Sequence, residues 1–457
     1  MKVSKPPSLE GKISLDSAID AVFTERLSGA KYLHYDQLRH RTSSKEELDK
    51  LWVYLRFGRV MSAKWLNIIA KGDKTSFFNT ASINITSTMQ KSCSIVDRLT
   101  SSAAEAERHE KFNADNYLMT ELTAAESIAS SQLEGAATTS RIALEMIKVG
   151  RKPRDDSEKM IMGNYRMMQH ISEGGNSPLS TKEILRLQHV AVEGIDNDKY
   201  SPGQLRSATD DVVVVDHEGN IIHTPIEAEY LEEALTKLCK FINTPHETAE
   251  DEHYLHPLIK ATIIHFMIGY LHPFKDGNGR TARALFYWYM LKCGYSAFRY
   301  ISISKLLKNA PSKYVKSYLY TETDELDLTY FVDYQCEIVS RAVKEYTDYI
   351  KELLKTRGEL AGWLYSEGIA DKINNRQLAL ATTAIQNPGV LFTAAEVSQQ
   401  LKISDNTARD DLKKLTELGL MQSIKEGKGN VYLSPKSLHE LKKWNSKIQN
   451  KTSTQDW

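Results

Sequence analysis

The stretch HPFKDGNGRTAR at residues 272–283 decides how the rest of the chain is interpreted. Its Gly-Asn-Gly segment frees the backbone to adopt left-handed conformations, so that successive N–H groups can converge on an anion. A helix that begins there would add the positive end of its dipole. Arg280 and Arg283 lie one turn apart and would share one face of that helix. We therefore expect a loop that binds a polyphosphate, with His272 free to handle a proton nearby.

The composition is that of a soluble globular protein. The 457 residues are 41% hydrophobic and 26% charged, and 59 Lys and Arg balance 59 Asp and Glu. This balance gives no global charge that would favour nucleic acid or an anionic membrane. The length is sufficient for two or three domains, each with its own core.

The cysteines and the apolar segments indicate a reducing compartment. Four cysteines are scattered without a C-x-x-C pair, at Cys93, Cys239, Cys293 and Cys336. We interpret them as buried thiols and not as a metal site or a disulfide frame. The first residues lack the apolar core of a signal peptide, and the most apolar helix, around residues 263–271, is too short to cross a membrane. We expect a cytoplasmic protein without a membrane partner.

The apolar periodicity predicts a mainly α-helical chain with several regions. Residues 1–95 look mixed, and residues 96–350 are mostly amphipathic helix. Residues 351–375 predict a charged helical linker, and residues 435–457 a polar tail. One segment departs from the helical pattern, because a run of valines, Val212, Val213, Val214 and Val215, precedes a turn and a second β-branched run. It predicts a β-hairpin within the helical region.

Residues 376–434 have the rhythm of a winged helix-turn-helix. The predicted elements are helices over 376–386, 393–401 and 405–418, then wing strands over 420–424 and 430–433. Seven Lys or Arg stand against six Asp or Glu in this region, whereas a DNA-binding module usually shows a clearer basic footprint. DNA binding, recruitment of a protein partner and dimerisation all stay open.

The stretch at 272–283 is similar, at each fixed position, to the H-x-F-x-[D/E]-G-N-G-R-x-x-R signature of the Fic (Fic/Doc) family. Residues 256–266 resemble the helix that precedes the family's motif loop, and residues 202–206 resemble the P-G-x-x-R segment before its β-hairpin flap. The resemblance covers about residues 100 to 340. Residues 32–36 are similar to an N-terminal region of many bacterial members, and a C-terminal winged helix is a frequent companion.

Fic proteins mostly transfer AMP from ATP to a hydroxyl side chain of a protein. The resemblance therefore implies a Fic-type helical core with a flap, and a protein adenylyltransferase that modifies Ser, Thr or Tyr of a target or of itself. His272 would be the general base. Asp276 would hold Mg²⁺ bridging the α- and β-phosphates of ATP.

The remaining motif residues would bind the nucleotide. Asn278 and the amides of Gly277 and Gly279 would cradle the α- and β-phosphates. Arg280 would hold the β-phosphate and Arg283 the γ-phosphate.

Two aromatic residues complete the predicted site. Phe274 would be a buried anchor for the loop, and Lys275, at a variable position, gets no role. Tyr314 lies where relatives contact the nucleotide, although a core role fits it as well.

The hairpin would hold the target segment by main-chain pairing, or it would merely close one side of the core.

An upstream segment, SSQLEG at residues 130–135, matches the inhibitory motif [S/T]-x-x-x-E-[G/N] of Fic proteins whose inhibitory helix precedes the catalytic core. Ser130, Glu134 and Gly135 stand at its fixed positions. Glu134 would pair with Arg283 and deny that arginine to the γ-phosphate, so that ATP binds in an unproductive pose.

Two other functions stay open. The same Glu134 carboxylate would position a water for removal of AMP from a modified protein. A non-enzymatic alternative is a DNA-binding regulator whose Fic core senses a nucleotide. A homodimer is compatible with either function.

Overall fold

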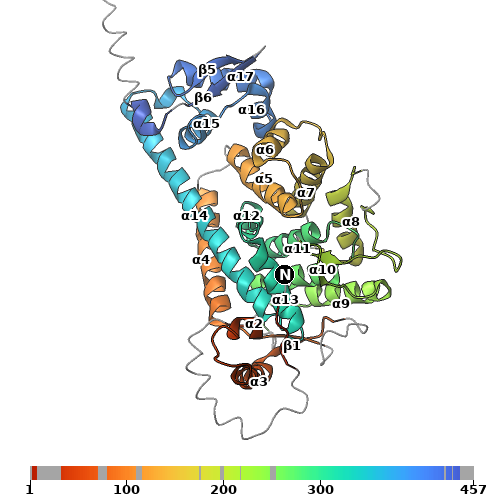
Figure 1. The fold of residues 1–457 in the computed structure, drawn as a ribbon. Coiled ribbons are helices and arrows are strands. Elements are labelled where there is room, and N and C mark those ends of the chain that lie inside the picture. The colour runs from red at the N-terminus through yellow and green to blue at the C-terminus, as the bar shows by residue number, and fades with distance from the viewer. Residues whose placement is uncertain are drawn as a thin grey trace, which may run out of the picture.

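The computed structural model describes residues 3–7, 32–69, 80–109, 116–173, 177–195, 200–216, 218–246, 254–426, 429–434 and 436–442. The protein is mostly helical, which confirms the predicted fold class (Figure 1). The α-helices are α2 (Tyr35–Leu38), α3 (Lys45–Ser62), α4 (Ser87–His109), α5 (Asn116–Leu133), α6 (Ser140–Val149), α7 (Asp156–Glu173), α8 (Thr181–Val192), α9 (Leu231–Asn243), α10 (Pro257–Leu271), α11 (Asn278–Lys292), α12 (Ser304–Asn309), α13 (Pro311–Thr323), α14 (Thr329–Ser366), α15 (Asn375–Gln386), α16 (Ala394–Leu401) and α17 (Asp405–Glu417).

Among the described residues, the strands form three antiparallel pairs, each made of strands that are neighbours in sequence. They are β1 (Lys64–Leu66) with β2 (Ala81–Ile83), β3 (Val214–Val215) with β4 (Ile221–His223), and β5 (Gln422–Glu426) with β6 (Gly429–Leu433). Pairs this small cannot build a core of their own. The helices therefore supply the interior.

Helices α10 and α11 pack against each other at the centre of the molecule. Every residue of α10 except Gly269 is buried, as expected for a helix that is apolar on all sides. Helices α5, α7 and α8 contact α11, and α4, α9 and α14 contact α10. The described part of the chain holds no helix that is long and apolar enough to span a membrane.

The N-terminal region joins this core through a buried ionic network. A small apolar cluster combines residues of α2 and α3 with Tyr330 of α14. Beside it, the Arg56 guanidinium lies 3.1 Å from Asp324 and 3.3 Å from Asp327. The Tyr32 hydroxyl donates to Asp327 at 2.7 Å. The predicted boundary at residue 95 falls inside α4, which packs along α14.

The hairpin forms where the valine run predicts it, but it is shorter. Strand β3 contains only Val214 and Val215, and Val212 and Val213 precede it. Val214 pairs with His223 and Val215 with Ile221, with a register shift between the two pairs. The bulge accommodates one extra residue in β4.

A second hydrophobic core holds the C-terminal helix-turn-helix. Helices α15, α16 and α17 and the strand pair β5–β6 form in the predicted order. The predicted boundaries are too narrow, because Leu360 and Trp363 of α14 and Leu438 and Leu441 of the predicted tail are buried in this core. Residues 427 and 428 of the wing and most of the tail lie outside the described residues.

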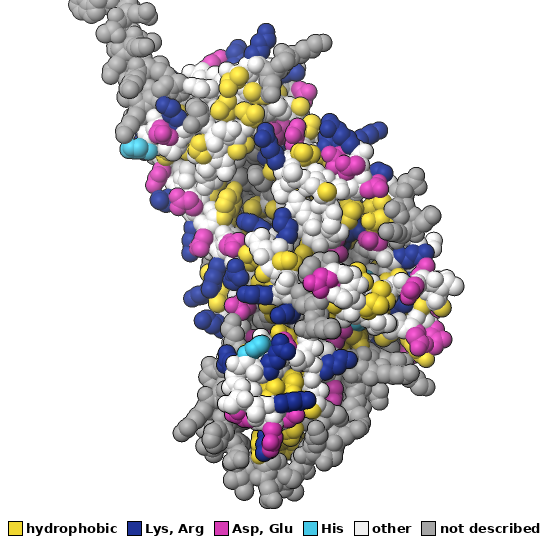
Figure 2. Space-filling model, in the orientation of Figure 1, with side chains coloured by type: hydrophobic (Ala, Val, Ile, Leu, Met, Phe, Trp, Pro, Cys, Tyr) yellow, Lys and Arg dark blue, Asp and Glu magenta, His cyan; other side chains and the backbone are white. Residues whose placement is uncertain are grey.

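The surface matches the balanced composition. Figure 2 shows Lys and Arg side chains intermixed with Asp and Glu over the face in view. All four cysteines are free thiols, buried at Cys93, Cys239 and Cys336 and partly exposed at Cys293.

Candidate active site

The turn between α10 and α11 carries the motif, and two left-handed residues shape it. His272 ends α10 with φ 46°, and Gly277 precedes α11 with φ 87°. Phe274 is fully buried, as predicted for a loop anchor. The Asn278 side chain braces this anchor, because it accepts from Phe274 N at 2.9 Å and donates to Phe274 O at 2.8 Å. This bracing role was not predicted, and contact of Asn278 with a phosphate stays a prediction.

The His272 ring is held in one tautomer. Its Nδ1 lies 3.2 Å from the Gly269 carbonyl oxygen, which can only accept. Nδ1 therefore carries the proton and Nε2 keeps a free lone pair. Burial lowers the pKa of His272 to about 4, so the ring is neutral at pH 7 and Nε2 is able to accept a proton.

Two side chains fix the backbone of the motif loop, Arg206 of the P-G-x-x-R segment and Gln188, which the sequence did not single out. The Arg206 guanidinium donates through Nε to His272 O at 2.8 Å, and Arg206 N donates to Pro273 O at 2.9 Å. The Gln188 side chain donates to Asp276 O at 3.0 Å and accepts from Gly203 N at 2.6 Å. Both side chains therefore position the loop without touching the predicted reacting atoms.

Asp276 and Arg280 form an ion pair across the first turn of α11. The Arg280 Nη2 lies 2.7 Å from Asp276 Oδ1, and Nη1 donates to Ala191 O at 2.9 Å. Arg280 is fully buried, whereas the Asp276 side chain is 37% exposed. Burial raises the pKa of the Asp276 carboxyl, although Arg280 opposes the shift. The carboxylate thus faces solvent on one side.

Arg283 meets the upstream segment, as predicted. Its Nη2 lies 2.8 Å from Glu134 Oε1, and its Nε donates to Ser130 Oγ at 2.8 Å. The Arg283 side chain is 1% exposed and the Glu134 side chain 33%. Burial works against the guanidinium charge, but the Glu134 carboxylate raises the pKa of Arg283 overall.

The Glu134 carboxylate also lies directly against Gly279. A Cβ added at Gly279 would lie 2.0 Å from Glu134 Oε1. Only glycine allows this approach, so the carboxylate occupies the space over the first turn of α11. An anion is favoured there by the helix dipole.

Glu126, two turns before Glu134, anchors the same helix to another part of the core. Its carboxylate accepts from Ser302 Oγ at 2.9 Å and from Ser304 N at 3.0 Å. It thereby ties α5 to the beginning of α12. Burial raises the pKa of the Glu126 carboxyl, while hydrogen bonds from Ser304 oppose the shift. This role of Glu126 was missed because its partners lie far along the chain.

The hairpin is attached to the motif loop and to the core by charged contacts. His223 of β4 lies between Glu322, at 2.8 Å from Nδ1, and the Tyr270 carbonyl oxygen, at 2.7 Å from Nε2. The Lys275 ammonium lies 2.8 Å from Asp210, just before the hairpin. Lys275, which received no role from the sequence, therefore joins the hairpin to the loop.

Tyr314 sits in an aromatic cluster. Its hydroxyl lies 2.8 Å from His265 Nε2, and its ring packs against Tyr318 and Phe331. This placement gives Tyr314 a core role. Contact with a nucleotide stays a prediction.

The residues of the loop fit a phosphate-bound magnesium ion. Mg²⁺ is commonly held by one or two carboxylates together with substrate phosphates and water. Asp276 is such a carboxylate, and the described residues contain no group of three or more His, Cys, Asp or Glu that would form an all-protein cage. Arg280 Nε and Arg283 Nη1 are buried donors without a hydrogen-bond partner in the described part of the chain. Both guanidiniums have a donor left for an anion.

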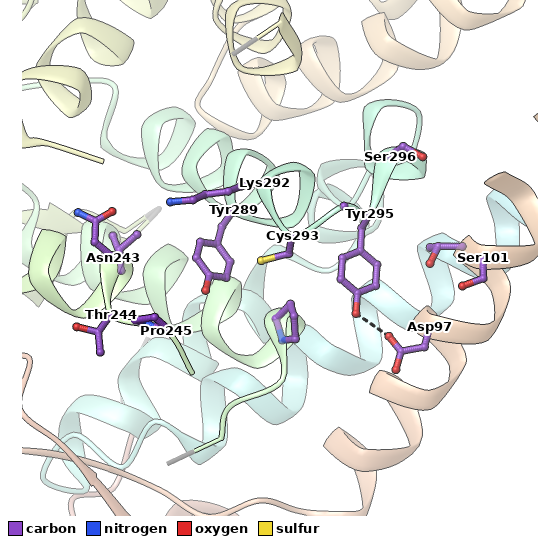
Figure 3. Close-up of a pocket in the computed structure, with 14 residues that line it drawn as sticks. Asp97, Ser101, Asn243, Thr244, Pro245, Tyr289, Lys292, Cys293, Tyr295 and Ser296 are labelled. Atoms are coloured by element: carbon purple, nitrogen blue, oxygen red, sulfur yellow. Dashed lines mark hydrogen bonds between the residues drawn. The ribbon is translucent and has the colours of Figure 1, made fainter. Parts of the chain in front are cut away.

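A cleft of about 900 Å³ lies at the opposite end of α11 from the motif. Figure 3 shows Tyr295 donating to Asp97 across it, at 2.7 Å, with Lys292 and Cys293 nearby. Asp97 also lies 3.1 Å from His256 Nε2, at the start of α10. The cleft contains no residue of the motif, so its size does not mark the predicted chemistry.

The site described above agrees with a known family. Residues 178–290 match the model of the Fic/DOC family. The chain contains a Fic/DOC domain. Its matched span holds the motif loop, the hairpin and the two loop-positioning residues Gln188 and Arg206. The segment at 130–134 lies before this span. Residues 384–428 match the DeoR-like helix-turn-helix domain.

Curated relatives match a short part of the chain. The chain is 38% identical over 72 residues to protein adenylyltransferase fic-1 of Caenorhabditis briggsae, which is 16% of this chain and 13% of that protein. It is 34% identical over 73 residues to protein adenylyltransferase Fic of Nematostella vectensis, 16% of each. The chain thus spans only about a seventh of the length of these relatives.

A solved structure shares the fold more widely. A Fic family protein from Desulfovibrio desulfuricans G20 superposes with a TM-score of 0.51 and 16% identity, and covers 77% of this chain and 97% of its own. At that identity the likeness shows the fold alone. Together with the family match, it confirms a Fic-type helical core.

Proposed function

We propose that the protein transfers AMP from ATP to a hydroxyl side chain of a protein target, and that Glu134 restrains this activity. One observation carries the proposal. A neutral histidine ends α10, a buried arginine follows in α11 after the motif turn, and a carboxylate of the same chain pairs with that arginine.

The chemistry follows from the His272 tautomer. The target hydroxyl oxygen would attack the α-phosphorus of ATP and form a new P–O bond, while the bond from that phosphorus to the bridging oxygen of the β-phosphate breaks. The hydroxyl proton would go to His272 Nε2, because Nδ1 is already protonated. Pyrophosphate is the leaving group. The backbone contacts of Arg206 keep the ring in place during the transfer.

Nucleotide binding would use the donors and the carboxylate of the loop. Arg280 and Arg283 each have a buried donor left for a phosphate oxygen. Asp276 would hold Mg²⁺, which when bound neutralises phosphate charge. The same position of Asp276 beside Arg280 keeps its carboxylate oriented before the ion binds.

The restraint would be a competition for Arg283. The Glu134 carboxylate pairs with Nη2 of the Arg283 guanidinium and fills the space over Gly279. A γ-phosphate that needs this arginine would have to displace the carboxylate. Since orientation supplies much of the catalysis in phosphoryl-transfer sites, a nucleotide that fails to displace it would be held out of line.

The hairpin would present the target. Val215 and Ile221 are 51% and 62% exposed, so the hairpin has an uncovered apolar face beside the motif loop. An extended target segment can pair with such an edge through its main chain, which places little demand on its sequence. Self-modification by a second copy of the chain is compatible with this arrangement.

The test is intact-mass measurement after incubation with Mg²⁺ and ATP, CTP, GTP or UTP. Glu134→Gly is expected to gain one or more nucleotide masses faster than the wild type, and the gain should vanish when His272→Ala is added. Glu134→Gln is the matched control that keeps the side-chain volume and removes the charge. If Glu134→Gly acquires no His272-dependent mass with any nucleotide and any added protein extract, the proposal fails.

A second candidate is removal of AMP from a modified protein. It is supported by the 33% exposure of the Glu134 side chain, which leaves the carboxylate accessible to a water molecule. One variant distinguishes the two activities. Glu134→Gly should raise transfer of AMP, whereas it should abolish its removal.

A DNA-binding regulator is a third candidate. Helix α17 leaves Asn406, Arg409 and Lys413 exposed, and in a helix-turn-helix these side chains would face a DNA groove. A salt-dependent shift of the promoter DNA of its own gene, lost in Arg409→Ala, would support it. Absence of binding at low salt would exclude it.

A further inference from the structure

The helix-turn-helix rests on the part of the chain that carries Glu134. Helix α16 contacts both α5 and α6, and Figure 1 shows it beside them. Helix α5 ends at Leu133 and α6 begins at Ser140, so Glu134 lies in the short connection between the two contacted helices. The family match begins at residue 178, and this contact therefore lies outside the matched Fic/DOC span.

The contact contains a buried ion pair. Lys148 Nζ of α6 lies 3.4 Å from Glu396 Oε1 of α16, and the two side chains are only 7% and 9% exposed. A charge this deeply buried is costly without its partner. Reversing one of the two charges should therefore separate the helices, whereas exchanging both should leave them docked.

Close packing at the end of α6 supports the same interface. Gly150 ends α6 in the left-handed conformation, with φ 66°. A Cβ added there would lie 2.4 Å from the Gln399 side chain of α16. The end of the Gln399 side chain thus packs directly against the C-terminal end of α6.

The recognition helix stays available while α16 is docked. Helix α17 packs on α16 through Ala408 and Leu412, which are fully buried. Its outer face carries Arg409 and Lys413, which are exposed. A partner bound to that face would therefore act on the helix that touches α5 and α6.

We propose that the docked helix-turn-helix holds Glu134 against Arg283, and that its displacement releases the adenylyl-transfer site. The inference rests on the proposed function and names its regulation. The element with two states is the connection between α5 and α6, engaged on Arg283 or withdrawn from it. Coupling of this kind needs both sites to bias one such element, and here α16 biases it from outside and the nucleotide from within.

The test reverses the charges of Lys148 and Glu396, singly and together, and measures the rate of nucleotide incorporation. Lys148→Glu and Glu396→Lys should each raise the incorporation rate about fivefold or more, and the double exchange should return it to the wild-type rate. In the Glu134→Gly background none of the three should change the rate. Arg141→Glu, on the exposed side of α6, is the matched control and should leave the rate unchanged.

One further variant and one further measurement guard against misfolding of the charge-reversed proteins. Lys148→Met removes the charge with little change in volume and serves if the reversals fail to fold. Hydrogen exchange at residues 128–139 should rise in Lys148→Glu and fall back in the double exchange, whatever the activity. Unchanged exchange and incorporation in folded single variants overturn the inference. Absence of nucleotide incorporation in Glu134→Gly would overturn the proposed function alone. The hydrogen-exchange measurement would still decide whether the helix-turn-helix is coupled to Glu134.

Discussion

The motif loop at 272–283 and the segment at 130–134 meet at Arg283, but they are held in different ways. Buried backbone and side-chain bonds from Asn278, Arg206 and Gln188 hold the loop from within the core. Glu134 reaches the site from an exposed connection. The difference indicates that the core fixes the geometry of the motif loop. The Glu134 carboxylate that pairs with Arg283 comes from an exposed connection, so its withdrawal should cost little free energy.

The largest effect is expected from breaking the loop. Asn278→Leu leaves the N–H and the carbonyl of Phe274 buried without partners, which should lower the free energy of unfolding by about 2–5 kcal/mol. Denaturant unfolding measures this change. Lys275→Ala, on the exposed side of the same loop, should cost less than about 1 kcal/mol. Equal losses in the two variants would contradict the contrast between a rigid loop and its exposed contacts.

Acid should weaken the loop through His272. Its pKa in the folded state is about 4, below the ordinary value of about 6.5, so its contribution is complete above pH 6.5 and is lost as the pH falls towards 4. At pH 5 the loss should be about 2 kcal/mol. Unfolding of wild type and His272→Gln at pH 7 and pH 5 isolates this amount, since other buried histidines affect both proteins. A pH dependence that is the same in both would refute it.

Removal of Glu134 should change stability little and nucleotide binding more. Glu134→Gly should lower the free energy of unfolding by about 1–2 kcal/mol, because the carboxylate is one-third exposed and Ser130 still contacts Arg283. ATP with Mg²⁺ should then raise the melting temperature more than in the wild type. Gly279→Ala displaces the same carboxylate but fills the space itself. Its ATP-dependent shift should not exceed that of the wild type.

The smallest effect is expected from loosening α5 at Glu126. Glu126→Gln keeps one acceptor for Ser304 N and loses the charge, at a cost of about 1 kcal/mol. A slight withdrawal of Glu134 should follow, seen as incorporation between that of wild type and Glu134→Gly. The double variant should match Glu134→Gly. An added increase there would mean that Glu126 acts directly on catalysis.

Sequence alone predicted what lies in consecutive residues. The motif loop, the hairpin and the order of the helix-turn-helix elements were recognisable because each depends on local spacing. The resemblance to the family also predicted the pairing of Glu134 with Arg283.

The positioning residues of the site could not be found in this way. Gln188, Arg206 and Glu126 are single polar residues whose partners lie 88, 66 and 178 positions away. Arg206 stands in the P-G-x-x-R segment, but that pattern does not indicate its contacts, and no local pattern distinguishes Gln188 or Glu126 from a solvated surface residue. The contact between Lys148 and Glu396 was missed for the same reason, since it joins two domains.

Helix α14 has a consequence for how the molecule unfolds. Ile350 and Leu353 are buried in the first core, and Leu360 and Trp363 in the second. The two cores therefore share one uninterrupted helix, with only about 10 Å between Leu353 and Leu360 at 1.5 Å per residue. Unfolding of either core would disrupt the helix against which the other core packs, so we expect calorimetry to record a single cooperative transition. The helix-turn-helix and the Fic/DOC domain match different family models but should unfold as one thermodynamic unit.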